Sequence, residues 1–173
     1  KLYSKLKSAE YNARIQHLNH MKEIGYLIAT GSLVGLPGQT SNDLINDILL
    51  AKELNADMLS FGPFIPHPNT PLCSPNVVDL DTVLKVLAIS RLVIPDSKIL
   101  VTTALETLDS DGLKRGLLGG ANSFMINVTP TKYKKFYDIY PNKYGINTDV
   151  NETIKEKLEL LYSIGRAPTD LGM

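Results

Sequence analysis

The stretch YLIATGSLVGLPGQT, residues 26–40, decides the fold class. Residues 26–36 are rich in apolar residues and β-formers, which predicts a parallel strand buried on both faces. A Pro-Gly pair at residues 37–38 signals a turn. Thr40, with Asp43 three positions later, has the pattern that caps a helix at its amino end. A buried strand that runs through a short turn into a helix is the first βα unit.

The same unit recurs along the chain. Before this first unit, residues 11–24 have apolar side chains at helical spacing. This pattern predicts a helix with one buried stripe, and the glycine that follows would end the helix. Further strands are expected at residues 57–64, 98–103 and 122–126, and further helices at residues 80–94, 111–118, 132–139 and 152–164. Four βα units require parallel strands with helical crossovers. The pattern fits a doubly wound open sheet or part of an eight-stranded barrel.

The composition is that of an ordinary globular chain. Its 173 residues, 43% hydrophobic, are enough for one domain core. Eighteen basic residues balance eighteen acidic ones, so no net charge attracts nucleic acid or an anionic membrane. The single Cys73 forms no internal disulfide and fits a reducing, cytoplasmic compartment. The first residue is a lysine close to a helical pattern, which indicates a fragment.

Two loops at predicted carboxyl ends of strands carry the informative motifs. GSLVGLPGQT (31–40) places glycines where backbone approaches a neighbour, and amides at a helix start, although a structural turn explains the bare pattern as well. GPFIPHPNTPL (62–72) holds four prolines, so Phe64 and Ile65 are fixed in place and suit a flat adenine ring. His67 lacks the further ligands of a metal site and is interpreted as a loop histidine bonded to backbone.

Other polar and aromatic residues allow two interpretations each. Thr102 and Thr103 offer two hydroxyls to an anion or carboxylate, although β-branched residues also simply end strands. Arg14 could hold a carboxylate through two parallel hydrogen bonds, but its pattern favours a solvated surface arginine. No Ser-His-Asp set, phosphate-loop lysine or carboxylate pair stands out. Aromatic residues at helical spacing predict mostly packing positions, with one free to face a cavity: Tyr133, Phe136, Tyr137 and Tyr140.

Four stretches in this order resemble the biotin-synthase-like radical S-adenosylmethionine (SAM) maturase of FeFe-hydrogenase: GSLVGLPGQT, GPFIPHPNTPL, LVIPDSKILVTTALETL and GGANSFMINVTPTKYKKFYDIYP. The resemblance covers residues 6–141, and biotin synthase and methylornithine synthase share the layout. It implies a radical SAM (β/α)8 barrel of TIM type. This chain would supply about strands five to eight, as a single partial domain over residues 1–173 that lacks the cluster-binding half.

The resemblance also implies cofactors and residue roles. The intact family protein binds SAM and one 4Fe-4S cluster through a Cys-x3-Cys-x2-Cys loop, and it cleaves SAM reductively to a 5′-deoxyadenosyl radical. This sequence has no such loop, so the chain alone would be inactive and would hold no metal. The residues expected around SAM are Arg14 at its carboxylate, with Leu33, Met58, Phe64 and Ile65 near adenine. The residues expected around a small carboxylate-bearing substrate are Thr102, Thr103, Met125 and Tyr137.

Two alternatives stay open. Another biotin-synthase-like enzyme, such as a methylornithine synthase, would differ around Thr102 and Tyr137, where the substrate lies. Alternatively, the chain is a structural half-barrel whose two open sheet edges pair with a second copy, which predicts self-association.

Overall fold

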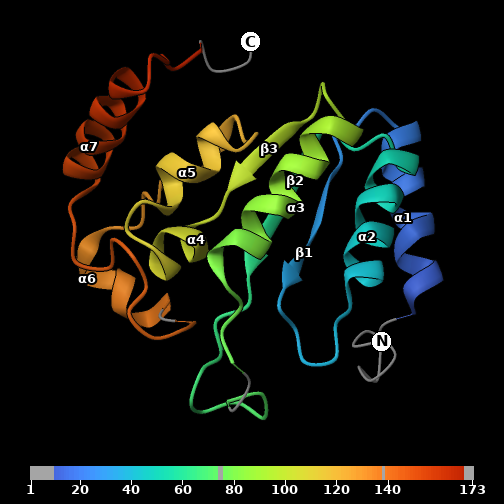
Figure 1. Cartoon of the computed structure of the whole chain (residues 1–173), viewed down its shortest axis with the longest axis horizontal. Coiled ribbons are helices and arrows are strands. Elements are labelled where there is room, and N and C mark those ends of the chain that lie inside the picture. Colours follow the sequence, from blue (N-terminus) through green and yellow to red (C-terminus); the bar gives the residue numbers. More distant parts are fainter. Residues whose placement is uncertain (1–9, 74–75, 138, 170–173) are drawn as a thin grey trace.

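A computed structural model describes residues 10–73, 76–137 and 139–169, and its centre is a parallel sheet with helices packed against it (Figure 1). The strands are β1 (Ala29–Val34), β2 (Met58–Pro63), β3 (Lys98–Val101) and β4 (Ser123–Phe124). The helices are α1 (Tyr11–Glu23), α2 (Ser41–Glu53), α3 (Leu80–Val93), α4 (Thr103–Leu108), α5 (Gly112–Leu118), α6 (Thr131–Lys134), the 3-10 helix η2 (Lys135–Tyr137) and α7 (Val150–Ser163).

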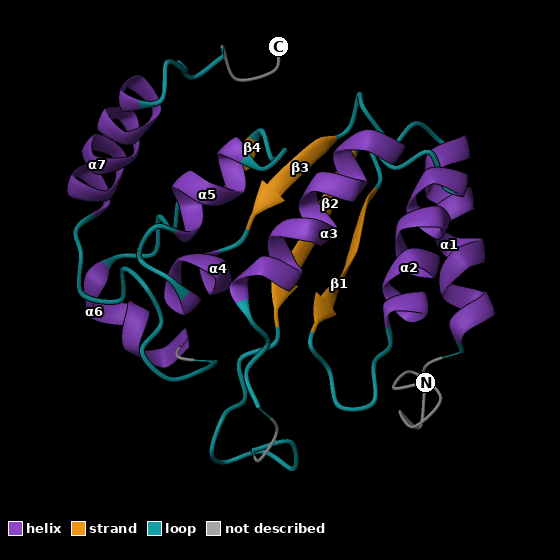
Figure 2. Ribbon diagram, in the orientation of Figure 1, coloured by secondary structure: helices purple, strands orange, loops and turns teal. Residues whose placement is uncertain are grey.

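The strand order selects the barrel over the doubly wound sheet. The four strands lie in the order β1-β2-β3-β4, and every neighbouring pair is parallel. A doubly wound sheet reverses its strand order at a switch point, whereas a barrel adds each strand on the same side. The strands run without reversal and point toward one end of the molecule (Figure 2). The predicted half of a (β/α)8 barrel is confirmed.

The core lies between the sheet and the helices α2, α3 and α5. Leu59, Phe61 and Ile99 on the strands are fully buried, as are Val83 and Leu87 on α3. Each such side chain contributes about 2 kcal/mol through removal from water. Because side chains alternate along a strand, this packing fixes one face of the sheet to the helices and directs the intervening residues to the opposite face. We call that opposite face the inner face.

Helix caps follow the local signals. Thr40 and Asp43 form the predicted capping box: the Thr40 side chain accepts from the Asp43 amide at 3.3 Å, and Asp43 Oδ2 accepts from the Thr40 amide at 2.8 Å. Gly25, after α1, has φ +94°, a left-handed conformation that glycine adopts freely. The starts and ends of these helices are therefore encoded locally.

Two predictions about which residues are buried in the amino-terminal part are wrong. None of the residues of α1 is buried, and Met21 is 39% exposed, because α1 lies outside α2 rather than on the sheet (Figure 1). The strand predicted at residues 26–36 begins only at Ala29, and Leu27 is 80% exposed. Within the described chain β1 pairs with β2 alone, so one strand edge and the inner face stay open.

Predictions for the carboxyl-terminal part differ more. The strand expected at residues 98–103 ends at Val101, and a helix that the sequence pattern did not reveal, α4, follows at once. The strand expected at residues 122–126 is confined to the two residues of β4. The helix expected at residues 132–139 is short α6 followed by η2, so the aromatic residues do not form one packed stripe. Three of them are largely exposed: Tyr133, Phe136 and Tyr137.

Among the described residues, none of the helices combines the length and apolar character that crossing a membrane requires.

Candidate functional site

A cavity of about 340 Å³ opens on the inner face, near the carboxyl ends of the first three strands. Its lining comes from β1, β2 and the start of α4: Gly31, Ser32, Leu33, Ser60, Gly62, Thr102 and Ala104. Ligand pockets typically measure about 300–1,000 Å³ and lie at this end of a TIM-type barrel. The lining is mostly glycine, serine and threonine, whereas bulky branched residues fill an ordinary barrel interior. This inner face leaves room for a ligand.

Two glycines bring neighbouring strands together beneath the cavity. Gly31 has φ +156°, and a Cβ at this position would lie 1.9 Å from the Ser60 carbonyl oxygen. A Cβ on Gly62 would lie 2.6 Å from Thr102 Oγ1. Any larger residue at either position would therefore displace a strand or the Thr102 hydroxyl. The two glycines therefore allow the strands to approach closely at the base of the cavity, with the Thr102 hydroxyl at its edge.

The wall on the β1 side is an apolar residue near the end of β1, and hydrogen bonds hold the loop that follows it. Leu33 is 46% exposed on the inner face. The Gln39 side chain closes the following loop: its Oε1 accepts from the amides of Gly35 and Leu36 at 2.7 and 3.2 Å, and its Nε2 donates to the Leu33 carbonyl at 2.8 Å. Sequence reasoning missed this role, although an amide side chain after a glycine turn is a usable signal.

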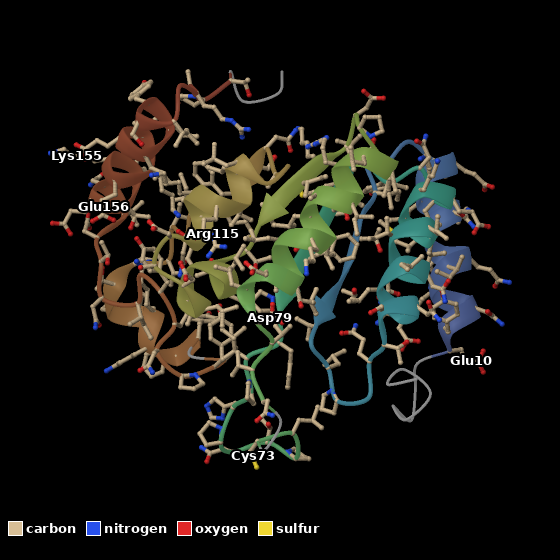
Figure 3. All side chains as sticks on the ribbon, in the orientation of Figure 1. Glu10, Cys73, Asp79, Arg115, Lys155 and Glu156 are labelled. Carbon is tan, nitrogen blue, oxygen red and sulfur yellow. The ribbon has the colours of Figure 1, made fainter. Side chains whose placement is uncertain are left out.

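The β2–α3 loop continues the pairing of β1 with β2. The Phe64 amide donates to the Val34 carbonyl at 2.8 Å, which ties the loop to the end of β1. His67 Nδ1 accepts from the Asn69 amide at 3.1 Å, so the interpretation of His67 as a loop histidine bonded to backbone is confirmed. Figure 3 shows Cys73 at the tip of this loop, directed away from the sheet. The described residues contain no group of three or more His, Cys, Asp or Glu placed to hold a metal ion.

The β3 side of the cavity ends in a helix cap. Thr102 Oγ1 accepts from the Leu105 amide at 3.4 Å as the N-cap of α4. Its hydroxyl hydrogen can still be donated to a ligand. The Thr103 carbonyl accepts from Thr107 Oγ1 at 3.0 Å, which stabilises the first turn. The two threonines therefore differ in place, since Thr102 lines the cavity and Thr103 is the first residue of α4.

The cavity brings together two of the residues that the resemblance assigns to ligands, Leu33 and Thr102. Met58 lines a second hollow of about 750 Å³ at the amino ends of the strands, the end that serves stability in TIM-type barrels. Outside the cavity lining lie Arg14, Phe64, Ile65, Thr103, Met125 and Tyr137. The amino end of α1, which carries Arg14, lies at the same end of the molecule as the strands' carboxyl ends (Figure 1). The roles of all these residues stay predictions.

A buried ion pair joins α4, the helix capped by Thr102, to α7. Lys157 Nζ on α7 donates to Glu106 Oε1 on α4, and each side chain is only 6% exposed. Burial raises the pKa of Glu106, while the hydrogen bond and charge of Lys157 oppose that rise. Burial and the nearby acidic groups Glu156 and Glu106 also raise the pKa of Tyr144. Glu106 and Lys157 are 51 positions apart in the sequence, so no local sequence pattern predicts the pair.

Residues 60–167, more than half of the chain, match the family described as Biotin and Thiamin Synthesis associated domain. The chain therefore belongs to this family, and the predicted resemblance to biotin-synthase-like radical SAM proteins is confirmed. It is 40% identical over 168 residues to the FeFe hydrogenase maturase subunit HydE of Thermotoga maritima, covering 96% of this chain and 48% of that protein. It is 26% identical over 115 residues to biotin synthase of Acinetobacter calcoaceticus, covering 65% and 35%.

The crystal structure of methylornithine synthase (PylB) has the same fold. It matches with a TM-score of 0.67 at 22% identity, over 94% of this chain and 47% of that one. The chain thus spans about half the length of the maturase and of this structural neighbour.

The cavity residues fit the nucleoside part of SAM. Leu33 offers an exposed apolar surface to a ring, and Gly31 and Gly62 line the cavity at positions where a Cβ would clash with Ser60 or Thr102. The Thr102 hydroxyl supplies a donor at the edge. A 4Fe-4S cluster does not fit the described residues, because Cys73 is the single cysteine of the sequence and is exposed on a loop.

Proposed function

We propose that this chain is the SAM- and substrate-binding half of a radical SAM enzyme that acts in the maturation of the FeFe-hydrogenase active site. The maturase of Thermotoga maritima, 40% identical over nearly the whole chain, supports the assignment to maturation. Reductive cleavage of SAM supplies a 5′-deoxyadenosyl radical in this class of enzyme. The chain is inactive alone, since a 4Fe-4S cluster requires thiolate ligands from another segment.

The observation that carries the proposal is the cavity on the inner face. Residues from two separate motifs, Leu33 and Thr102, line one hollow whose floor is glycine and serine. In the proposed enzyme Leu33 packs against adenine, and Phe64 and Ile65 lie around the same ring, whereas Met58, at the amino end of β2, is too far along the strand to join them. Arg14 binds the SAM carboxylate from the first turns of α1.

The substrate lies on the β3–β4 side of the same face. The Thr102 hydroxyl and the amides at the start of α4 can donate hydrogen bonds to a small carboxylate-bearing molecule. Thr103, Met125 and Tyr137, outside the lining of the hollow itself, would contact the part of the substrate that extends beyond it. The free thiol of Cys73 fits a reducing compartment, so we place the protein in the cytoplasm.

A chimera tests the proposal. Residues 6–173 of this chain replace the matching half of the Thermotoga maritima maturase, and the product is reconstituted anaerobically with iron and sulfide. Dithionite reduction should then yield 5′-deoxyadenosine from SAM, and Arg14→Ala should weaken SAM binding about tenfold or more. A chimera with a full cluster that leaves SAM intact would contradict the proposal.

A biotin-synthase-like enzyme with another substrate, such as a methylornithine synthase, is the weaker enzymatic alternative, because identity to the biotin synthases is 26–28%. Binding of a sulfur-containing carboxylate by the chimera favours the maturase. Loss of that binding in Thr102→Ala, with SAM cleavage retained, would assign the carboxylate to this side of the cavity.

A second candidate function is self-association of the half-barrel. Within the described chain, β1 and β4 each pair on one side only, and Leu27, Met125 and Val128 near these edges are largely exposed. Two copies related by a twofold axis along the barrel would supply eight parallel strands. Light scattering at micromolar concentration should give twice the chain mass, and a clean monomer would contradict self-association.

A further inference from the structure

Lys157 is a buried cation that contacts three separate elements. Its neighbour on α7, Lys155, points outward into solvent (Figure 3), whereas Lys157 is 5% exposed. The amine donates to Glu106 on α4. It also lies 5.2 Å from the ring centroid of Phe124 on β4 and 5.6 Å from that of Tyr144.

Each of these contacts leads directly to the substrate side of the cavity. Glu106 is one helical turn after Thr102, and its amide donates to the Thr102 carbonyl at 3.4 Å. Phe124 is the last residue of β4 and directly precedes Met125. A single amine therefore contacts α4, the helix capped by Thr102, and β4, the strand that leads to Met125.

A second connection joins the same carboxyl-terminal segment to α4. The Tyr144 amide donates to Thr107 Oγ1 at 2.9 Å, and that hydroxyl donates to the Thr103 carbonyl at 3.0 Å. Since Tyr144 also lies over Lys157, the two connections converge from the same side. The first turn of α4 is thus fixed by contacts with α7 and with Tyr144 in the segment that leads into α7.

We propose that Lys157 and Glu106 are positioning residues, which hold the amino end of α4 and the carboxyl end of β4 in the arrangement that the substrate requires. What the cavity binds rests on the proposed function. A buried ion pair adds little net stability over apolar residues of the same volume, but its hydrogen bond fixes one geometry. The exposed pair of Arg115 with Asp81, at 2.8 Å, lies on the outer helices and has no such connection to the cavity.

Hydrogen exchange on the whole chain tests this role. In the double variant Glu106→Leu/Lys157→Met, which replaces the pair by apolar side chains, the Asp109 amide, which closes α4 by donating to the Leu105 carbonyl, should exchange about tenfold faster or more. The amide of Phe64, bonded to Val34 on the other side of the sheet, should be unchanged. Asp81→Asn, the matched control for loss of an ion pair, should change neither amide.

Rescue and a milder variant complete the test. Glu106→Gln keeps an acceptor for Lys157 and should protect the Asp109 amide better than Glu106→Leu alone, which leaves the buried amine with neither an acceptor nor a counter-charge. If the double variant does not fold, Phe124→Leu removes only the ring contact and should speed exchange at Asn122, whose amide donates to Ile99, but not at Phe64. Unchanged exchange at α4 and β4, or equal acceleration at Phe64, overturns the proposal.

The chimera adds a readout on function. The double variant should keep the KM for SAM within about twofold, because Leu33 and Arg14 lie on β1 and α1, whereas the pair joins α4 to α7. Equal damage to SAM binding would contradict a role confined to the substrate side. If the chimera failed to cleave SAM, the proposed function would be contradicted. The hydrogen-exchange result would still decide whether Lys157 and Glu106 are positioning residues.

Discussion

The two sides of the cavity are held by different kinds of contact. On the β1 side, Gln39 closes its loop through bonds to residues three to six positions away. On the β3–β4 side, α4 is held by Lys157, 51 positions from its partner Glu106, and by Tyr144, 37 positions from Thr107. The first side is encoded locally, and the second depends on the folded arrangement of α7.

This difference predicts different responses to mutation. A locally held loop loses a few hydrogen bonds when one side chain is removed, and the sheet beneath it stays intact. A side held by a buried charge pair loses far more, because an unpaired charge is left away from water.

Lys157→Met should lower the free energy of unfolding by about 3–5 kcal/mol, because it leaves the Glu106 carboxylate buried without its partner. Urea denaturation with far-UV circular dichroism measures this loss. The Glu106→Leu/Lys157→Met variant should recover most of it. A double variant that is as unstable as the single one would show that the charge is not the cause.

Gly31→Ala should lower the free energy of unfolding by about 3 kcal/mol, since its Cβ would lie 1.9 Å from the Ser60 carbonyl oxygen. Gly38 is the matched control, with φ +74° and open space around its Cβ position. Gly38→Ala should cost only about 1–2 kcal/mol for the left-handed conformation. Equal losses in the two variants would exclude the close approach of β1 to β2 as the reason for Gly31.

Gln39→Ala should cost about 1–2 kcal/mol, because three hydrogen bonds that the loop can partly replace with water are lost. Gln16→Ala on the exposed surface of α1 should change stability by less than about 0.5 kcal/mol. Proteolysis of the loop should accelerate in the first variant alone. A loss as large as that of Lys157→Met would remove the contrast between the two sides.

The smallest effect is a pH dependence from Glu106, whose pKa is raised by burial above the ordinary value of 4.5. The native state then holds this proton more tightly than the unfolded chain, so stability falls as pH rises from about 4.5 through the raised pKa. Lys157 and Tyr144 are the titratable groups that interact with it, and Glu156 in turn acts on Tyr144. Glu106→Gln should flatten the profile above pH 4.5 in urea titrations. An unchanged profile would contradict this source.

The sequence predicted the locally encoded features. The alternation of strands and helices, the Thr40 cap and the backbone-bonded His67 follow from patterns within a few residues. It did not predict α4, because Thr102 and Thr103 have high β propensity and the helix depends on packing against α5 and α7. Burial was also misjudged for α1 and β1, since periodicity shows an apolar stripe but not which neighbour covers it.

For the site, motifs located Leu33 and Thr102, which share one cavity. Ser60 could have been found as well, because it alternates with buried Leu59 and Phe61 along β2. The pair of Glu106 with Lys157 could not, since a contact across 51 positions leaves no local signal.

We propose that the inner face of this half-barrel binds SAM on the β1–β2 side and the substrate on the β3–β4 side. A crystal structure of the reconstituted chimera with SAM would show both sides at once. Adenine should lie against Leu33 and the SAM carboxylate at Arg14, with an open space bounded by Thr102 and Met125. SAM bound elsewhere, or lying against Thr102 with Leu33 uncovered, would contradict this proposal.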